Sequence, residues 1–193
     1  ERRETYATTG PRIGLRFYGG FDIDESVLHA QTLSDESGVV PMGSELLATD
    51  KRPPVFVAHA MADPKSGTLD RIQIVKGWVT ASGESSEKVF DIAWSSENRL
   101  NADGSLIPVP NTVNLETGAW SNEAGAASLS AAWTDPEFDP SIRAFYYLRV
   151  LEVPTPRHSL LDKIALGGDV ETRRPDVIQE RAYSSAIWYQ PAP

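Results

Sequence analysis

The sequence predicts a mostly β domain, an antiparallel, immunoglobulin-like β-sandwich with one or two short helices. Seven segments have apolar side chains at alternate positions, which is the period of a β-strand. These segments are rich in β-branched and aromatic residues and are bounded by Gly, Pro, Asp and Asn. Several short strands separated by turn residues are typical of two packed antiparallel sheets.

The first strand is expected within residues 11–20. Ile13, Leu15 and Phe17 fall on one face of this segment, and Gly19 and Gly20 end the run. Six further segments have the same alternation, and we expect each of them to be a strand. They are residues 54–61, 69–79, 87–94, 126–133, 143–153 and 180–189.

Helical patterns are few. Residues 24–35 and 158–168 are the two segments that favour a helix, and the second ends on a glycine pair, as helices often do. The loops are marked by proline and small polar residues, and none is long or biased enough to be an interdomain linker. The 193 residues therefore suit one domain.

The N-terminal residues predict a junction with a preceding element. Residues 1–5 resemble the last turn of a helix, and Gly10 and Pro11 are residues that end helices. We expect residues 1–11 to be the end of an upstream helix. Residues 12–193 would then form a single β-sandwich domain.

The composition argues against two classes of partner. The formal net charge is −9, and the basic residues are scattered among acidic ones, so no nucleic-acid partner is expected. No run of about 18 apolar residues is present, so no membrane span is expected. The chain has no cysteine, which excludes disulfides, thiolate zinc sites and thiol nucleophiles.

Residues with catalytic chemistry form no complete motif. The three histidines fit no metal-binding spacing, and no nucleophile elbow or phosphate-binding loop is present. Asp135, Glu137 and Asp139 alternate in the loop DPEFDP and are weak candidates for a calcium site, although a solvated Asp-Pro turn explains the pattern as well.

Tryptophans offer a second kind of site. Trp78 and Trp120 lie near strand ends, where an exposed indole could stack on a sugar ring. The other three fall within strand patterns, where packing in the core is the ordinary role. They are Trp94, Trp133 and Trp188.

Six stretches resemble one protein family. RRETYATTGPRI, VPMGSEL, LDRIQIVKGW, KVFDIAW, AAWTDPEFDPSIRAFYYLRVLEVPTPR and IQERAYSSAIWY follow one another along essentially the whole chain. Together they resemble the carboxy-terminal part of a bacterial family of unknown function that is related to the PHP (polymerase and histidinol phosphatase) metallohydrolases.

This resemblance implies a supporting role for the chain. A barrel-like catalytic domain with a divalent metal would precede residues 1–11, so no catalytic residue carries over and this chain alone would not be an enzyme. The implied partner is that barrel, and the implied location is periplasmic or secreted. The domain would brace the barrel, and the loops at 38–46 and 152–160 could reach the mouth of its active site.

Two residues of the second loop are candidates for binding. Arg157 could pair with a phosphate or carboxylate, and a surface salt bridge is its alternative role. His158 stands where the family tends to have an aromatic residue after the sequence PTPR. Two other functions remain open for the whole chain. One is a carbohydrate-binding or other interaction sandwich that uses Trp78 or Trp120, and the other is a self-contained hydrolase that binds metal in the acidic loops.

Overall fold

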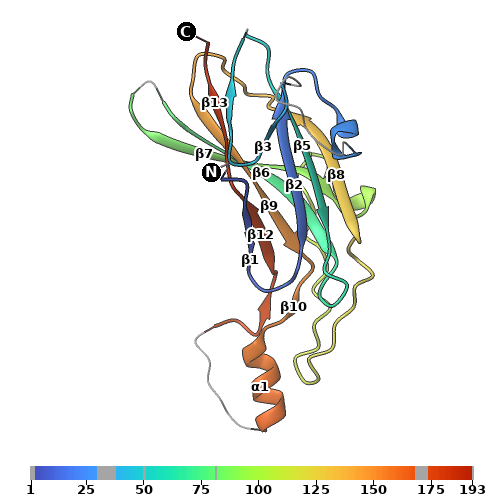
Figure 1. Ribbon diagram of the computed structural model, residues 1–193. Coiled ribbons are helices and arrows are strands. Elements are labelled where there is room, and N and C mark those ends of the chain that lie inside the picture. The colour runs from blue at the N-terminus through green and yellow to red at the C-terminus, as the bar shows by residue number, and fades with distance from the viewer. Residues whose placement is uncertain (1–2, 30–37, 50, 81, 168–173, 193) are drawn as a thin grey trace.

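The computed structural model describes residues 3–29, 38–49, 51–80, 82–167 and 174–192. Figure 1 shows two sheets packed face to face, which confirms the predicted mostly β, sandwich-like architecture. The large sheet consists of β1 (Tyr6–Thr8), β4 (Glu45–Leu47), β6 (Leu69–Val79), β7 (Ser85–Trp94), β9 (Ala144–Glu152), β12 (Arg181–Ser184) and β13 (Ile187–Gln190). The small sheet consists of β2 (Gly14–Gly20), β3 (Val40–Pro41), β5 (Val55–Met61) and β8 (Ser128–Thr134).

Strand β9 is the centre of the large sheet. One edge of β9 pairs with β6, which in turn pairs with β7. The other edge is shared by two strands, because β12 pairs with residues 149–151 and β13 with residues 144–146. Every pairing is antiparallel except that of β13 with β4, which is parallel. The sheet therefore departs at one edge from the antiparallel arrangement that the sequence predicts.

Alternating side chains of the two sheets form the core. Phe56 of β5 lies between the sheets, with its ring centroid 4.4 Å from that of Tyr146 on β9 and 5.8 Å from that of Phe17 on β2. All three residues are fully buried. The expected inward face of Ile13, Leu15 and Phe17 is confirmed, since all belong to the core.

Two buried carboxylates lie in the large sheet. Asp70 forms ion pairs with Arg99 at 2.6 Å and Arg71 at 2.9 Å. Glu152 accepts hydrogen bonds at Oε2 from Ser66 Oγ at 2.7 Å and from the backbone N–H of Gly67 at 3.1 Å. Its Oε1 atom is buried and has no hydrogen-bond partner among the described residues.

The remaining elements are short. Helix α1 (His158–Leu166) confirms the second predicted helix and ends at Gly167, which adopts the left-handed conformation of a C-cap. It lies below the sandwich in Figure 1, next to the two-stranded ribbon of β10 (Thr155–Pro156) and β11 (Val177–Ile178). The described residues also include the 3₁₀ turns η1 (Glu25–His29) and η3 (Glu97–Arg99). No helix within the described ranges has the length and apolar composition needed to cross a membrane.

Three local expectations differ from the structure. The turn of helix expected at residues 1–5 is not present at residues 3–5, and the next three residues form β1, which pairs with β12. The helix expected at 24–35 is the 3₁₀ turn η1 over residues 25–29, and residues 30–37 lie outside the described part of the chain. The strand expected at 180–189 is divided into β12 and β13.

Candidate functional site

The outer face of the large sheet carries a row of aromatic side chains. Because successive residues of a strand point to opposite faces, the inward Tyr146 of β9 is flanked by Phe145 and Tyr147 on the outer face. Trp188 of β13 pairs with Phe145, and their ring centroids are 5.2 Å apart. The rings of Phe145 and Tyr147 are stacked at 6.4 Å. The same strand thus supplies large apolar side chains to both of its faces.

Gly77 of β6 determines how the Phe145 ring lies. The two residues are cross-strand partners, and an added Cβ at Gly77 would lie 2.1 Å from Cζ of Phe145. The ring therefore covers the backbone of β6 directly, at a distance that only glycine permits. The sequence places a glycine in the middle of a strand here because the ring needs the space.

These residues form a groove of about 590 Å³, which we call the aromatic groove. Trp188 is 42% exposed and Val79 is 58% exposed. Arg143, Glu87 and Gln190 contribute polar groups to the lining. A concave apolar surface with a few polar groups is the usual form of a binding site. Such a surface can receive an apolar side chain of another protein or the face of a sugar ring.

The structure places the tryptophans in different surroundings. Trp78 lines the aromatic groove, but its ring is partly buried and lies 5.1 Å from Nζ of Lys76. Trp120 is 39% exposed on a loop and is not part of the groove lining. Trp133 packs against Phe56 in the core, as expected.

The expectation of a core position is wrong for Trp188. Ile187 and Tyr189 take the two inward positions of β13, which turns Trp188 outward. The sequence signal for the outer position of Trp188 is its alternation with Ile187 and Tyr189. That signal does not say which face meets solvent, because both faces of this strand are apolar.

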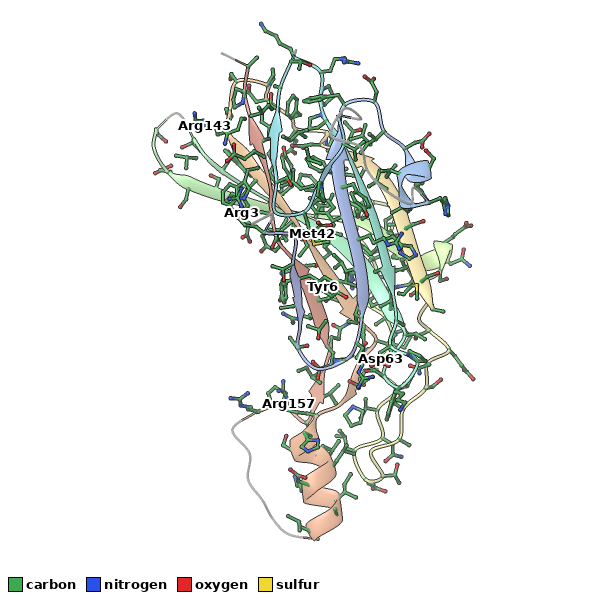
Figure 2. All side chains as sticks on the ribbon, viewed as in Figure 1. Arg3, Tyr6, Met42, Asp63, Arg143 and Arg157 are labelled. Atoms are coloured by element: carbon green, nitrogen blue, oxygen red, sulfur yellow. The ribbon has the colours of Figure 1, made fainter. Side chains whose placement is uncertain are left out.

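Arg157 and His158 lie at the other end of the molecule. Figure 2 shows Arg157 beside α1, far from Arg143 of the aromatic groove. Arg157 stands at the N-cap position of α1 without a side-chain capping hydrogen bond, and its Nε donates to the carbonyl of Pro175 at 3.0 Å. His158 is the exposed first residue of the helix. The two loops that were expected at the active site, 38–46 and 152–160, are also apart from each other. In Figure 2, Met42 of the first loop lies at mid-height, whereas Arg157 of the second lies near the lower end.

The three acidic residues of the loop DPEFDP have separate roles. Asp135 is buried and accepts hydrogen bonds from Lys76 Nζ at 2.5 Å and from the hydroxyl of Tyr146 at 2.9 Å. Glu137 pairs with Lys88 at the surface. Asp139 accepts hydrogen bonds from Ser141, and these lower the pKa of its carboxyl.

Burial, followed by the neighbouring Asp135 carboxylate, raises the pKa of Tyr146. The phenol is therefore a donor to Asp135 across the physiological pH range. Within the described ranges, no group of three or more His, Asp and Glu side chains is placed to hold a metal ion.

The fold and the groove define a mostly β, sandwich-like domain with an exposed aromatic groove on its large sheet. A protein-family model, described as a protein of unknown function (DUF3604), matches residues 1–191. The chain belongs to this family. No curated protein and no solved structure matches it.

Proposed function

We propose that this chain is an accessory β-domain that binds a catalytic domain of the same polypeptide through the aromatic groove. The catalytic domain would be the PHP-related, metal-dependent hydrolase implied by the six resembling stretches, acting on a phosphate ester. It would hold the divalent metal, and the polypeptide would be periplasmic or secreted. The observation that carries the proposal is the exposure of Trp188 and Val79 in the lining of one groove on the large sheet.

An exposed aromatic groove favours a partner. Single apolar residues on a surface need no explanation, but contiguous apolar surface marks interaction sites. Here Trp188, Phe145 and Val79 line one groove, and Arg143 and Glu87 also contribute to its lining. Large aromatic side chains surrounded by polar groups are typical of residues that dominate the free energy of protein association.

The path of the N-terminal segment would bring the proposed catalytic domain to this side. Figure 2 shows Arg3 and Arg143 on the same side of the sandwich. The backbone of Arg3 lies against Gly43, where an added Cβ would be 2.2 Å from the Arg3 carbonyl oxygen. Strand β1 then fixes residues 6–8 to the sheet. A domain joined at this end would be held near the groove at a high effective concentration.

The test is to replace Trp188 with alanine in the full-length polypeptide and in the isolated chain. Trp120→Ala is the matched control, because Trp120 is 39% exposed and Trp188 is 42% exposed. With the two domains supplied as separate chains, we expect Trp188→Ala to weaken their association by about 30-fold or more, as loss of an interface hot spot does. Trp120→Ala should leave association unchanged.

Activity is measured on the same proteins. Phosphomonoesterase and phosphodiesterase assays with manganese, zinc and iron should show turnover in the full-length polypeptide and none in the isolated chain. Trp188→Ala should lower the thermal stability of the catalytic domain in the full-length protein. Equal association by the variant and the native chain would contradict the docking role. Turnover by the isolated chain would contradict the accessory role.

The aromatic groove also supports a second candidate, a carbohydrate-binding module. Trp188 offers an exposed indole face, and Arg143, Glu87 and Gln190 are polar groups that can hydrogen-bond sugar hydroxyls. This function predicts millimolar or tighter binding of oligosaccharides to the isolated chain, measured by calorimetry. Trp188→Ala would abolish the binding and Trp120→Ala would not. Saccharide binding without association of the catalytic domain would favour this candidate over the first.

A further inference from the structure

The outer face of the small sheet carries a second groove, of about 680 Å³, which we call the polar groove. Strands β2, β5 and β8 form its floor and η1 forms one wall. The strand register places Arg16 directly opposite His59, and His59 directly opposite Ser130. Side chains in directly opposite positions have Cβ atoms about 5 Å apart. A guanidinium, an imidazole and a hydroxyl group thus form one row across three strands.

Two hydrogen bonds hold η1 above the ends of this row. Arg16 Nη1 donates to the carbonyl of Leu28 at 2.7 Å. Ser130 Oγ donates to Oε2 of Glu25 at 2.8 Å. The positive end of the row is therefore at β2 and the negative end is at β8, with His59 between them.

His59 has no hydrogen-bond partner among the described residues, and it lies in the groove lining. Burial lowers its pKa, and the charges of Arg16 and His29 lower it further, while Glu25 acts in the opposite direction. The lowered pKa favours the neutral form of the imidazole. Arg16 and the imidazole of His59 line the same groove on adjacent strands.

We propose that Arg16 and His59 form a binding site for an oxyanion, the phosphate or carboxylate group of a small molecule. Among the described residues, Arg16 donates one of its five N–H groups to the carbonyl of Leu28, and its planar fork can also donate to two oxygens of such a group. His59 can add a donor from the neighbouring strand. The adjacent row of the floor contains Gly14 and the 55% exposed Met61, which suits an apolar body attached to the anion.

Titration of the histidine signals by NMR tests this site in the 193-residue chain. The chain has only three histidines, so the imidazole signals are resolved and His158 is an internal reference outside the groove. Inorganic phosphate and acetate are added in separate series, and sodium chloride holds the ionic strength constant. We expect the His59 signals to shift saturably and the pKa of His59 to rise, because a bound anion stabilises the imidazolium form. The series that saturates at lower concentration identifies phosphate or carboxylate as the group.

Substitution of Arg16 separates a site from general screening. Arg16→Gln should weaken anion binding by about 10-fold to 100-fold, the loss expected for a hydrogen bond to a charged group. Arg181→Gln, which removes an arginine from the large sheet, should have no effect. Arg16→Lys keeps the positive charge but lacks the planar guanidinium group, so it should lose less anion affinity than Arg16→Gln. The lysine variant is used for the test if the glutamine variant disturbs η1.

Three results would overturn the proposal. The His59 signals could stay unmoved by both anions. They could shift as much with sodium chloride alone as with phosphate or acetate. Alternatively, Arg16→Gln and Arg16→Lys could both bind the anion with native affinity. None of these results bears on the aromatic groove, which lies on the other sheet.

Discussion

Glu152 is a carboxyl group in the interior of the protein, 0% exposed, at the C-terminal end of β9. Burial raises its pKa from 4.5 to about 7, although hydrogen bonds from Ser66 and Gly67 act in the opposite direction. The folded state therefore binds the proton more tightly than the unfolded state does. The stabilisation from this proton is complete below about pH 4.5 and is lost as the pH rises through about 7.

Glu152→Gln should remove this pH dependence, because the amide keeps the shape of the protonated carboxyl and does not titrate. The free energy of unfolding of the native chain, relative to the variant, should fall by about 3 kcal/mol from low pH to pH 8. Urea unfolding at a series of pH values measures the difference. Glu116→Gln, at an exposed position, is the control and should follow the native chain. If the unfolding free energies of the native chain and of Glu152→Gln changed with pH in the same way, Glu152 would not be the source of the pH dependence.

Lys76 and Asp135 form a buried ion pair. Their side chains are 8% and 0% exposed, and Tyr146 donates to the same carboxylate oxygen. Asp135→Ala should cost about 3–5 kcal/mol of unfolding free energy, because it leaves the Lys76 ammonium buried without its partner. The double variant Lys76→Met with Asp135→Ala should be less destabilised than the sum of the single variants. Additive losses in urea unfolding would show that the pair has no coupling.

Strand β6 shows how one element serves both faces of a sheet. Its inward residues build the core, and its outer face is flattened at Gly77 to admit the Phe145 ring. Gly77 of β6 and the ring of its cross-strand partner Phe145 together form the floor of the aromatic groove.

Gly77→Ala should displace the Phe145 ring and destabilise the chain by about 1–3 kcal/mol, as overpacking does. It should also weaken whatever binds the aromatic groove. Gly14→Ala is the matched control, because a Cβ at this strand glycine would meet its nearest neighbour at an ordinary 3.7 Å. Thermal unfolding of the two variants makes the comparison. Equal stability of Gly77→Ala and the native chain would show that the ring moves without cost.

At the scale of the whole molecule, the two sheets share one core. Phe17 and Phe56 of the small sheet belong to the same buried cluster as Tyr146 and Leu148 of the large sheet. We therefore expect a single cooperative unfolding transition. Tryptophan fluorescence and far-UV circular dichroism should give coincident urea curves, and calorimetric and van't Hoff enthalpies should agree. Two separated transitions would mean that the sheets are independent units.

Much of this molecule could be predicted from the sequence, and the failures have physical reasons. The long strands β2, β5, β6 and β9 were found because a period of two persists over seven or more residues. Strands β3, β4, β10 and β11 have two or three residues each, too few to show a period. Pairing between β4 and β13 depends on long-range packing and leaves no local signal.

The candidate sites were harder to predict than the fold. Alternation places Arg16 and His59 on one face of their own strands, but only the register between β2 and β5 makes them neighbours. Likewise, Trp188 alternates with two apolar residues, so hydrophobicity alone cannot tell its outer position from an inner one. Both grooves arise from pairs of strands that are distant in the sequence.

The pairing of β1 with β12 and of β4 with β13 has a consequence for the synthesis of the chain. Residues 6–8 can pair only after residues 182–184 have been synthesised, and residues 45–47 only after residues 188–190 have been synthesised. A ribosome releases these partners only after nearly the whole domain has been translated. The nascent chain therefore carries unpaired strand edges for most of its synthesis, a period in which such edges are open to aggregation and to chaperones.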